Sequence, residues 1–288
     1  MMQSFNYLSP RTLEEAFDFL NQHGEDVKLI AGGTDLLVEI KAGLSNPKNV
    51  MNIKNLPELR GIHSKGENGL RLGALTTVYE LSNSALLMDL YPGLVQAASQ
   101  MASIQIRSLA TIGGNLCTAS PAADLASPLI ALDAEVVILS PSGERELPLE
   151  SFFLGPGTTV LKSNEILKEI ILPAPAGNLD VRKHSLRESK DIAIVGVATR
   201  LLLEGNTCLE ARIALAAVGP TPLRAKSAEK QIEGFEISAE RIDKAAQTAA
   251  EESTPIDDLR GSAWYRKHMV AVLVRRSLQV LTLPGERA

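Results

Sequence analysis

The chain has 288 residues, of which 45% are hydrophobic, and its formal net charge is −5 at pH 7. This length allows two or three small domains, and this composition favours a buried core over a disordered chain. The acidic balance argues against a general nucleic-acid binder or an anionic-membrane partner. No apolar stretch has membrane-spanning length and the N-terminus lacks the pattern of a signal peptide, so a cytoplasmic protein is expected.

Residues that commonly bind metals are few and scattered. The two cysteines, Cys117 and Cys208, are too few for an iron–sulfur cluster, and a disulfide framework is implausible in a cytoplasmic protein. The four histidines show no metal-ligand spacing. We therefore expect no metal site in this chain.

The first part of the chain predicts an alternation of helix and strand. A helix is expected to begin after Ser9 or Thr12 and to end at Gly24, because apolar residues recur there with helical spacing. Strands are predicted over 27–31 and 49–53, with a short helix over 35–41 between them. This unit ends near residues 56–57.

The next part predicts two hairpins and several helices, and ends at the Pro- and Gly-rich linker 173–178. The hairpins pair 61–64 with 70–75 and 136–140 with 145–147, and a further strand covers 166–172. Helices are expected over 76–82, 84–90, 92–101 and 121–132, the last with Ser120 as its N-cap. The segment 109–118 is expected to be a loop. Beyond the linker, strands are predicted over 181–186, 193–203 and 210–218, and helices over 222–232, 238–252 and 263–280.

Two Gly-Gly loops carry the clearest functional signal. The first is L-I-A-G-G-T-D-L at residues 29–36, and the second lies within L-A-T-I-G-G-N-L-C-T-A-S-P-A-A-D-L at 109–125. Glycine lets backbone N–H groups approach a phosphate, and a helix beginning just beyond adds its positive dipole end. Either loop alone could be a plain strand-to-helix turn. Together, and with Thr118, Ser120 and Asp124 nearby, they favour a large ligand held at its diphosphate.

Other common nucleotide and catalytic motifs are absent from the sequence. There is no G-x-G-x-x-G fingerprint, no P-loop and no G-x-S-x-G elbow. The segment 182–195, R-K-H-S-L-R-E-S-K-D-I-A-I-V, is rich in charge and then apolar. Its charges alone favour an exposed strand and turn. The alternative is a loop over a flat ligand, with Ile192 as the apolar contact and Lys183 as a positive group.

These motifs together resemble a known family. Four segments are similar to the FAD-binding medium subunit of the molybdenum hydroxylases. They are the two Gly-Gly loops and two segments further on, R-E-S-K-D-I-A-I-V-G-V-A at 187–198 and A-L-A-A-V-G-P-T-P-L-R-A at 214–225. This family includes xanthine dehydrogenase, carbon monoxide dehydrogenase and 4-hydroxybenzoyl-CoA reductase. The resemblance covers nearly the whole chain. It implies an α+β fold: an FAD-binding domain of the vanillyl-alcohol-oxidase type, with subdomains at 1–56 and 57–175, and a small C-terminal α+β domain at 178–288.

The resemblance also implies a site for non-covalent FAD. The first loop would wrap the diphosphate, Asp124 would bind a sugar hydroxyl, and Leu167 would pack near the adenine. Lys183 would lie near the pyrimidine end of the isoalloxazine, and Ile192 over the ring. Neither a catalytic residue nor a metal ligand is expected. The implied FAD-binding residues are Leu29, Ile30, Ala31, Gly32, Gly33, Thr34, Asp35, Leu36, Met101, Thr111, Gly114, Asn115, Cys117, Thr118, Ala123, Asp124, Leu167, Lys183 and Ile192.

The implied activity is that of an oxidoreductase subunit for electron transfer. Its expected partners are a molybdopterin-binding large subunit and a small subunit with 2Fe-2S clusters, in a heterotrimer or a dimer of heterotrimers. Electrons would pass through FAD to NAD+ or another acceptor, with no nucleic-acid partner and no membrane span.

The sequence also bears on the branch of the family. The short run from Asn115 to Asp124 counts against the reductase branch, which carries a cysteine-rich insertion. Thr34, Asp35 and Ile192 fit the xanthine dehydrogenase type better than the alternative, a carbon monoxide dehydrogenase medium subunit. A stand-alone flavin oxidase would need an acid–base residue near the flavin, and none is evident. A scaffold that has lost its flavin is disfavoured by the intact glycines.

Overall fold

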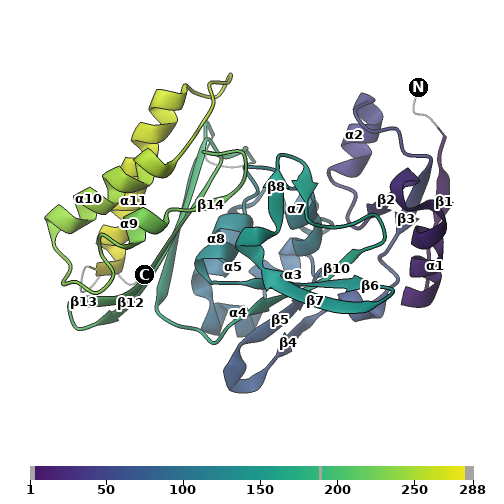
Figure 1. The fold of residues 1–288 in the computed structure, drawn as a ribbon, viewed down its shortest axis with the longest axis horizontal. Helices are drawn as coiled ribbons and strands as arrows, with labels where there is room; N and C mark the ends of the chain where they lie inside the picture. The colour runs from purple at the N-terminus through teal and green to yellow at the C-terminus, as the bar shows by residue number, and fades with distance from the viewer. Residues whose placement is uncertain (1–3, 188–189, 283–288) are drawn as a thin grey trace.

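A computed structural model describes residues 4–187 and 190–282 of the chain. The chain forms three parts that follow one another in sequence and in space, as the colours of Figure 1 show. Each part contains one larger sheet, of three, five and four strands respectively. We call these the N-terminal, middle and C-terminal parts.

The N-terminal part is a three-stranded parallel sheet with two helices. Its strand order is β1-β3-β2, and both strand pairs are parallel. Thr12 caps the first helix by accepting a hydrogen bond from the Glu15 N–H, so of the two predicted starts the structure selects Thr12. The short strand β1 was not predicted, because three residues, two of them exposed, carry no clear alternation. The elements are β1 (Asn6–Leu8), α1 (Leu13–His23), β2 (Val27–Ile30), α2 (Leu36–Ala42) and β3 (Asn49–Asn52).

The middle part has a five-stranded antiparallel sheet in the order β4-β5-β10-β6-β7. Both predicted hairpins and the predicted strand near 166–172 are confirmed. A small two-stranded sheet, β8 with β9, was not predicted. The strands are β4 (Ile62–Ser64), β5 (Leu70–Gly73), β6 (Glu135–Ser140), β7 (Gly143–Pro148), β8 (Phe153–Gly155), β9 (Thr158–Thr159) and β10 (Ile166–Leu172). The helices are α3 (Val78–Ser82), α4 (Ala85–Leu90), α5 (Pro92–Gln100), α6 (Ile104–Arg107), α7 (Ile112–Cys117) and α8 (Ala126–Ala131).

Two predictions for the middle part are wrong. The expected loop 109–118 contains the helix α7, which forms despite its glycine pair because Thr111 caps it and neighbouring chain segments accept its first N–H groups. The expected helix 121–132 is shortened to α8. Ser120 is therefore no helix cap, and its Oγ accepts a local hydrogen bond from the Ala122 N–H.

The C-terminal part is a four-stranded antiparallel sheet covered on both faces. In Figure 1, α10 and α11 lie against one face, while α5 and α8 of the middle part lie against the other. The helix predicted over 222–232 is wrong in extent, because a short strand occupies its first turn and only four residues are helical. The elements are β11 (Asn178–His184), β12 (Val195–Glu204), β13 (Thr207–Ala216), β14 (Leu223–Arg224), α9 (Lys226–Glu229), α10 (Ala239–Glu252) and α11 (Ala263–Thr282).

The apolar cores run across the boundaries between the parts. Leu75, Leu139 and Ile166 of the middle part belong to the same buried cluster as Leu20 and Met51 of the N-terminal part. The C-terminal sheet also contributes buried side chains to the core of the middle part. Over the ranges that the structure describes, every helix is too short or too polar to span a bilayer.

Candidate functional site

A cavity of about 390 Å³ lies between the N-terminal and middle parts. Its walls come from three segments: the first Gly-Gly loop, the second Gly-Gly loop with α7, and the segment 161–167 that leads into β10. The carboxyl end of β2 opens into this cavity through the first loop, which leads directly into α2. Apolar side chains, among them Leu20, Ile53 and Leu75, line part of it.

The first loop presents a row of backbone N–H groups without partners. None of the N–H groups of residues 32–36 donates a hydrogen bond to an acceptor within the described part of the chain. Gly33 has the left-handed φ of +73°, which turns the backbone sharply between β2 and α2. These residues line the cavity, and unpaired backbone N–H groups there can bind water or an anion such as a phosphate.

The second loop, in contrast, uses its own N–H groups inside the protein. The N–H of Ile112 donates to the carbonyl of Thr76, and the N–H of Gly113 donates to the carbonyl of Ala74. The N–H of Gly114 donates to Thr111 Oγ1 at 3.0 Å. The N–H groups of residues 112–114 are therefore not free for a ligand, to which these residues offer their shape instead.

The two loops contact each other directly. A Cβ atom placed on Gly32 would lie 2.0 Å from the carbonyl oxygen of Leu109, so only glycine permits this approach. Thr118 Oγ1 also donates to the Asp35 carboxylate at 3.4 Å. At Gly114, by comparison, an added Cβ would meet only Thr111 Oγ1, at 3.0 Å. The bare face of Gly114 is thus left open beside the cavity.

The structure brings most of the predicted FAD-binding residues together. The first loop, Met101, Leu167 and the predicted residues of the second loop up to Thr118 all line the large cavity. Ala123, Asp124 and Lys183 line a second cavity of about 20 Å³ between the middle and C-terminal parts. Ile192 lines neither cavity, and 51% of it is exposed.

Asp124 and Lys183 form an ion pair across the two parts, with 2.8 Å between Nζ and Oδ1. Burial raises the pKa of Asp124, and the ammonium group of Lys183 opposes this shift by favouring the carboxylate. Burial also raises the pKa of Cys117 to about 12, so its thiol is neutral and forms an ordinary part of the cavity wall.

Apart from Leu167, the residues of the third wall escaped the sequence analysis. Glu165 is buried there and accepts two hydrogen bonds from Arg145, at 3.0 Å from Nε and 2.8 Å from Nη2. The hydrogen bond from Arg145 holds the pKa of Glu165 below its usual range. Lys162 and Ser163 lie beside it in the wall. No sequence motif marks these residues; their position just before a predicted strand was the one available signal. Among the described residues, no cluster of side chains suits a metal ion.

Fold and cavity together suit a phosphate-bearing ligand held between two joined parts, with a third part packed against the middle one. Residues 3–175 match the family model of the FAD-binding domain in molybdopterin dehydrogenase, and residues 181–281 match that of the CO dehydrogenase flavoprotein C-terminal domain. The chain therefore belongs to the FAD-binding subunits of the molybdenum hydroxylase family. The predicted family, fold class and cofactor are confirmed.

Relatives with different named activities support this assignment. The carbon monoxide dehydrogenase medium chain of Hydrogenophaga pseudoflava is 36% identical over 95% of this chain and 96% of its own. The xanthine dehydrogenase FAD-binding subunit of Escherichia coli O157:H7 is 31% identical over 96% of this chain and 95% of its own. A solved structure of carbon monoxide dehydrogenase from H. pseudoflava matches with a TM-score of 0.94 at 35% identity, covering 98% of both chains. Quinoline 2-oxidoreductase from Pseudomonas putida 86 matches with a TM-score of 0.92 at 27% identity, over 98% of each chain.

Proposed function

We propose that this chain is the electron-transfer subunit of a molybdopterin-dependent hydroxylase. It would receive electrons from 2Fe-2S clusters on a small partner subunit, while a large partner holds the molybdopterin, and would pass them through FAD to NAD+ or another acceptor. The observation that carries the proposal is the row of unpaired N–H groups at residues 32–36, in a cavity within the matched FAD-binding domain. Relatives named as a medium chain and as an FAD-binding subunit support the multi-chain assembly.

The residues present fit FAD. The free N–H groups of the first loop would bind the diphosphate, and Leu167 would pack near the adenine at the third wall. Gly114 would let the ligand approach the second loop, beside Asn115 and Thr118. The proposal keeps the predicted division at 1–56, 57–175 and 178–288, since each range contains one of the larger sheets.

At the other end of the site, the chain supplies charge. Bound FAD would supply the chemistry that links one-electron carriers to a hydride acceptor. Asp124 would leave its ion pair to accept from a sugar hydroxyl, and Lys183 would then place its ammonium group near the pyrimidine end. A cation there favours negative charge on the ring. Ile192 is half-exposed on the segment that follows, where it could shield the ring from solvent.

For the branch of the family, we propose a xanthine dehydrogenase-like complex. Ile192, and Thr34 with Asp35 after the first glycine pair, support this branch. A carbon monoxide dehydrogenase medium subunit is the second candidate, because the relative with that name is 36% identical whereas the xanthine dehydrogenase relative is 31% identical.

The test is to purify the native complex and to measure its flavin, iron and molybdenum. One FAD on this chain, with iron and molybdenum on the partners, is the expected result. Reduction of the flavin by xanthine but not by carbon monoxide would support the first branch, and the reverse would support the second. A complex without flavin, or an isolated chain that oxidises alcohols or amines with oxygen, would contradict the proposal.

A further inference from the structure

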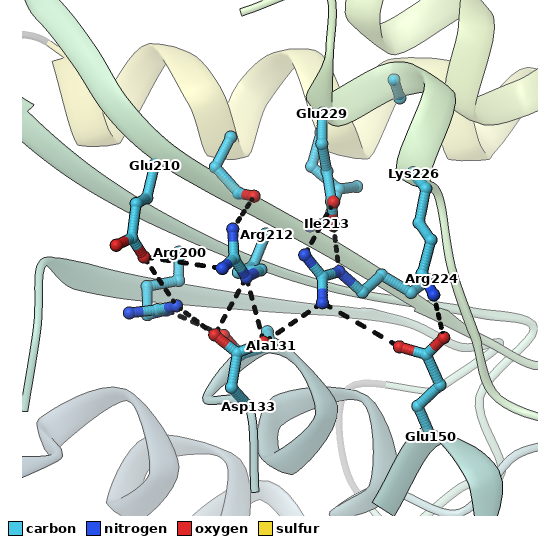
Figure 2. A network of polar contacts seen from close by, with 12 residues as sticks. Ala131, Asp133, Glu150, Arg200, Glu210, Arg212, Ile213, Arg224, Lys226 and Glu229 are labelled. Atoms are coloured by element: carbon cyan, nitrogen blue, oxygen red, sulfur yellow. Dashed lines mark hydrogen bonds and ion pairs between the residues drawn. The ribbon is translucent and has the colours of Figure 1, made fainter. Parts of the chain in front are cut away.

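A cluster of charged side chains joins the middle part to the C-terminal part, and Asp133 lies at its centre (Figure 2). Asp133 follows α8 with the left-handed φ of +53°. Its carboxylate accepts from Arg200 Nη2 at 2.5 Å, from Arg212 Nε at 2.9 and 3.0 Å, and from Arg224 Nη1 at 3.1 Å. These arginines come from three neighbouring strands, β12, β13 and β14.

Other contacts from the middle part reinforce this junction. Arg200 Nε donates to the carbonyl of Ala131, the last residue of α8, at 2.9 Å. Glu150 accepts a hydrogen bond from Lys226, which follows β14. The cluster therefore ties the end of α8 and the residues after β7 to three strands of the C-terminal sheet, β12, β13 and β14.

The charges of the cluster make Asp133 its central member. Three guanidinium groups side by side repel one another, and their side chains are largely withdrawn from water, with 6%, 18% and 17% exposed. Glu210, Glu229 and Glu233 each neutralise one or two of them from within the C-terminal part. Within the residues that the structure describes, Asp133 is the carboxylate that contacts all three.

One arginine of the cluster, Arg200, lies on β12, the strand that pairs with the strand of the flavin-site lysine. Lys183 on β11 pairs with Gly196, and Leu179 pairs with Arg200. Along the strands, the Lys183–Gly196 pair and the Leu179–Arg200 pair are four residues apart, a distance of about 13 Å. The buried helix α8 spans the same interval, with Asp124 just before it and Asp133 just after it. Two carboxylates at opposite ends of one helix thus hold the same sheet.

We propose that Asp133 is a positioning residue for the flavin site. It fixes the C-terminal sheet against α8, so that Lys183 keeps its place when Asp124 turns from Lys183 to bound FAD. The Asp124–Lys183 pair is then the contact that the ligand replaces, and the Asp133 cluster is the contact that persists. This inference rests on the proposed function of Lys183 and Asp124.

The test uses Asp133→Asn in the complete complex, with Glu233→Gln as the matched control. Both changes turn a carboxylate of the cluster into an amide, but Glu233 contacts Arg212 only from within the C-terminal part. We expect Asp133→Asn to weaken FAD binding by about tenfold, because the amide lacks the negative charge that offsets the three guanidinium groups. It should shift the flavin midpoint potential in the same direction as Lys183→Met. Combined with Lys183→Met, it should add little further shift.

The outcomes separate this inference from the proposed function. A flavin-containing complex in which Asp133→Asn leaves both affinity and potential unchanged overturns the inference alone, as does an equal effect of Glu233→Gln. A wild-type complex without flavin overturns both. If Asp133→Asn fails to assemble, Arg212→Gln removes from the opposite side the Nε–H that both carboxylate oxygens of Asp133 share, and the same outcomes apply.

Discussion

The two Gly-Gly loops look alike in sequence but differ in how they use their backbone. The N–H groups of residues 32–36 have no acceptor in the described part of the chain, whereas those of residues 112–114 all donate to nearby oxygens. The first loop therefore keeps its backbone donors free, as the proposed binding of a diphosphate requires. The second loop forms the start of the capped helix α7, in which Gly114 has no side chain to fill the space beside the cavity.

The glycines of the two loops also serve different structural purposes. Gly32 lets one loop touch the other, since a Cβ there would strike the Leu109 carbonyl. Gly113 packs tightly against Ala74, where a Cβ would lie 2.6 Å from the alanine Cβ. Gly114 alone leaves open space toward the ligand. The same Gly-Gly motif therefore has a different structural role in each of the two loops.

The largest effect is expected for Gly32→Ala, which disrupts the contact between the two Gly-Gly loops. A backbone clash at 2.0 Å cannot be relieved by a side-chain rotation. We expect the free energy of unfolding to fall by about 3 kcal/mol and flavin retention to be lost. Urea unfolding and flavin absorbance measure the two effects. Gly155→Ala, where an added Cβ meets nothing within 4 Å, is the control and should leave both unchanged.

Gly114→Val should separate ligand binding from folding. The new side chain meets Thr111 Oγ1 and otherwise enters the space beside the cavity, so it blocks the approach of FAD. Valine is no worse than glycine in a helix, and the free energy of unfolding should change by less than about 1 kcal/mol. The purified complex should contain no flavin. Full flavin occupancy in this variant would show that the second loop lies away from the ligand.

Thr111→Ala should give the opposite pattern. The change removes the helix cap that accepts from the Gly114 N–H, at a cost of about 1 kcal/mol in the free energy of unfolding. Because this change adds no bulk beside Gly114, FAD affinity should change far less than in Gly114→Val. Thr111→Ser keeps the hydroxyl and should restore stability. Loss of flavin at unchanged stability would instead give Thr111 a direct contact with FAD.

The smallest effect is expected at the third wall, with Arg145→Gln. Arg145 lowers the pKa of Glu165 in the folded protein. The pair therefore stabilises the fold at any pH above the pKa that Glu165 has in the unfolded chain. This stabilisation is lost as the pH falls through the pKa of Glu165 in the folded protein. Since 41% of the Arg145 side chain is exposed, we expect a loss below about 1 kcal/mol at neutral pH that vanishes in acid. Urea unfolding across this pH range measures it. A loss of stability that persists in acid would show that the ionised Glu165 is not its cause. Lys48→Gln, which removes an ion pair between two exposed side chains, is the control.

Local patterns in the sequence predicted much of the fold and marked both glycine pairs. The helix after Thr12, the hairpins and the three C-terminal strands follow from spacing, caps and turns. The state of the second loop could not be predicted, because its acceptors at Ala74 and Thr76 lie more than thirty residues earlier in the chain.

The same limit applies to the site. Asp124 and Lys183 were both singled out by the family resemblance, but nothing in the sequence shows that they pair with each other. Arg145 and Glu165 carry no motif, and only their contact across the fold reveals them. Side-chain pairs between distant segments depend on packing that a local pattern does not encode.

The core shared by the N-terminal and middle parts has a consequence for binding thermodynamics. Because Leu75, Leu139 and Ile166 pack in one cluster with Leu20 and Met51, the two walls of the cavity do not move as independent bodies. The slot has its width before the ligand arrives, so the loss of conformational freedom on association falls mainly on the flexible FAD molecule. A substitution within this cluster, such as Ile166→Ala, would then weaken binding by loosening a preorganised slot.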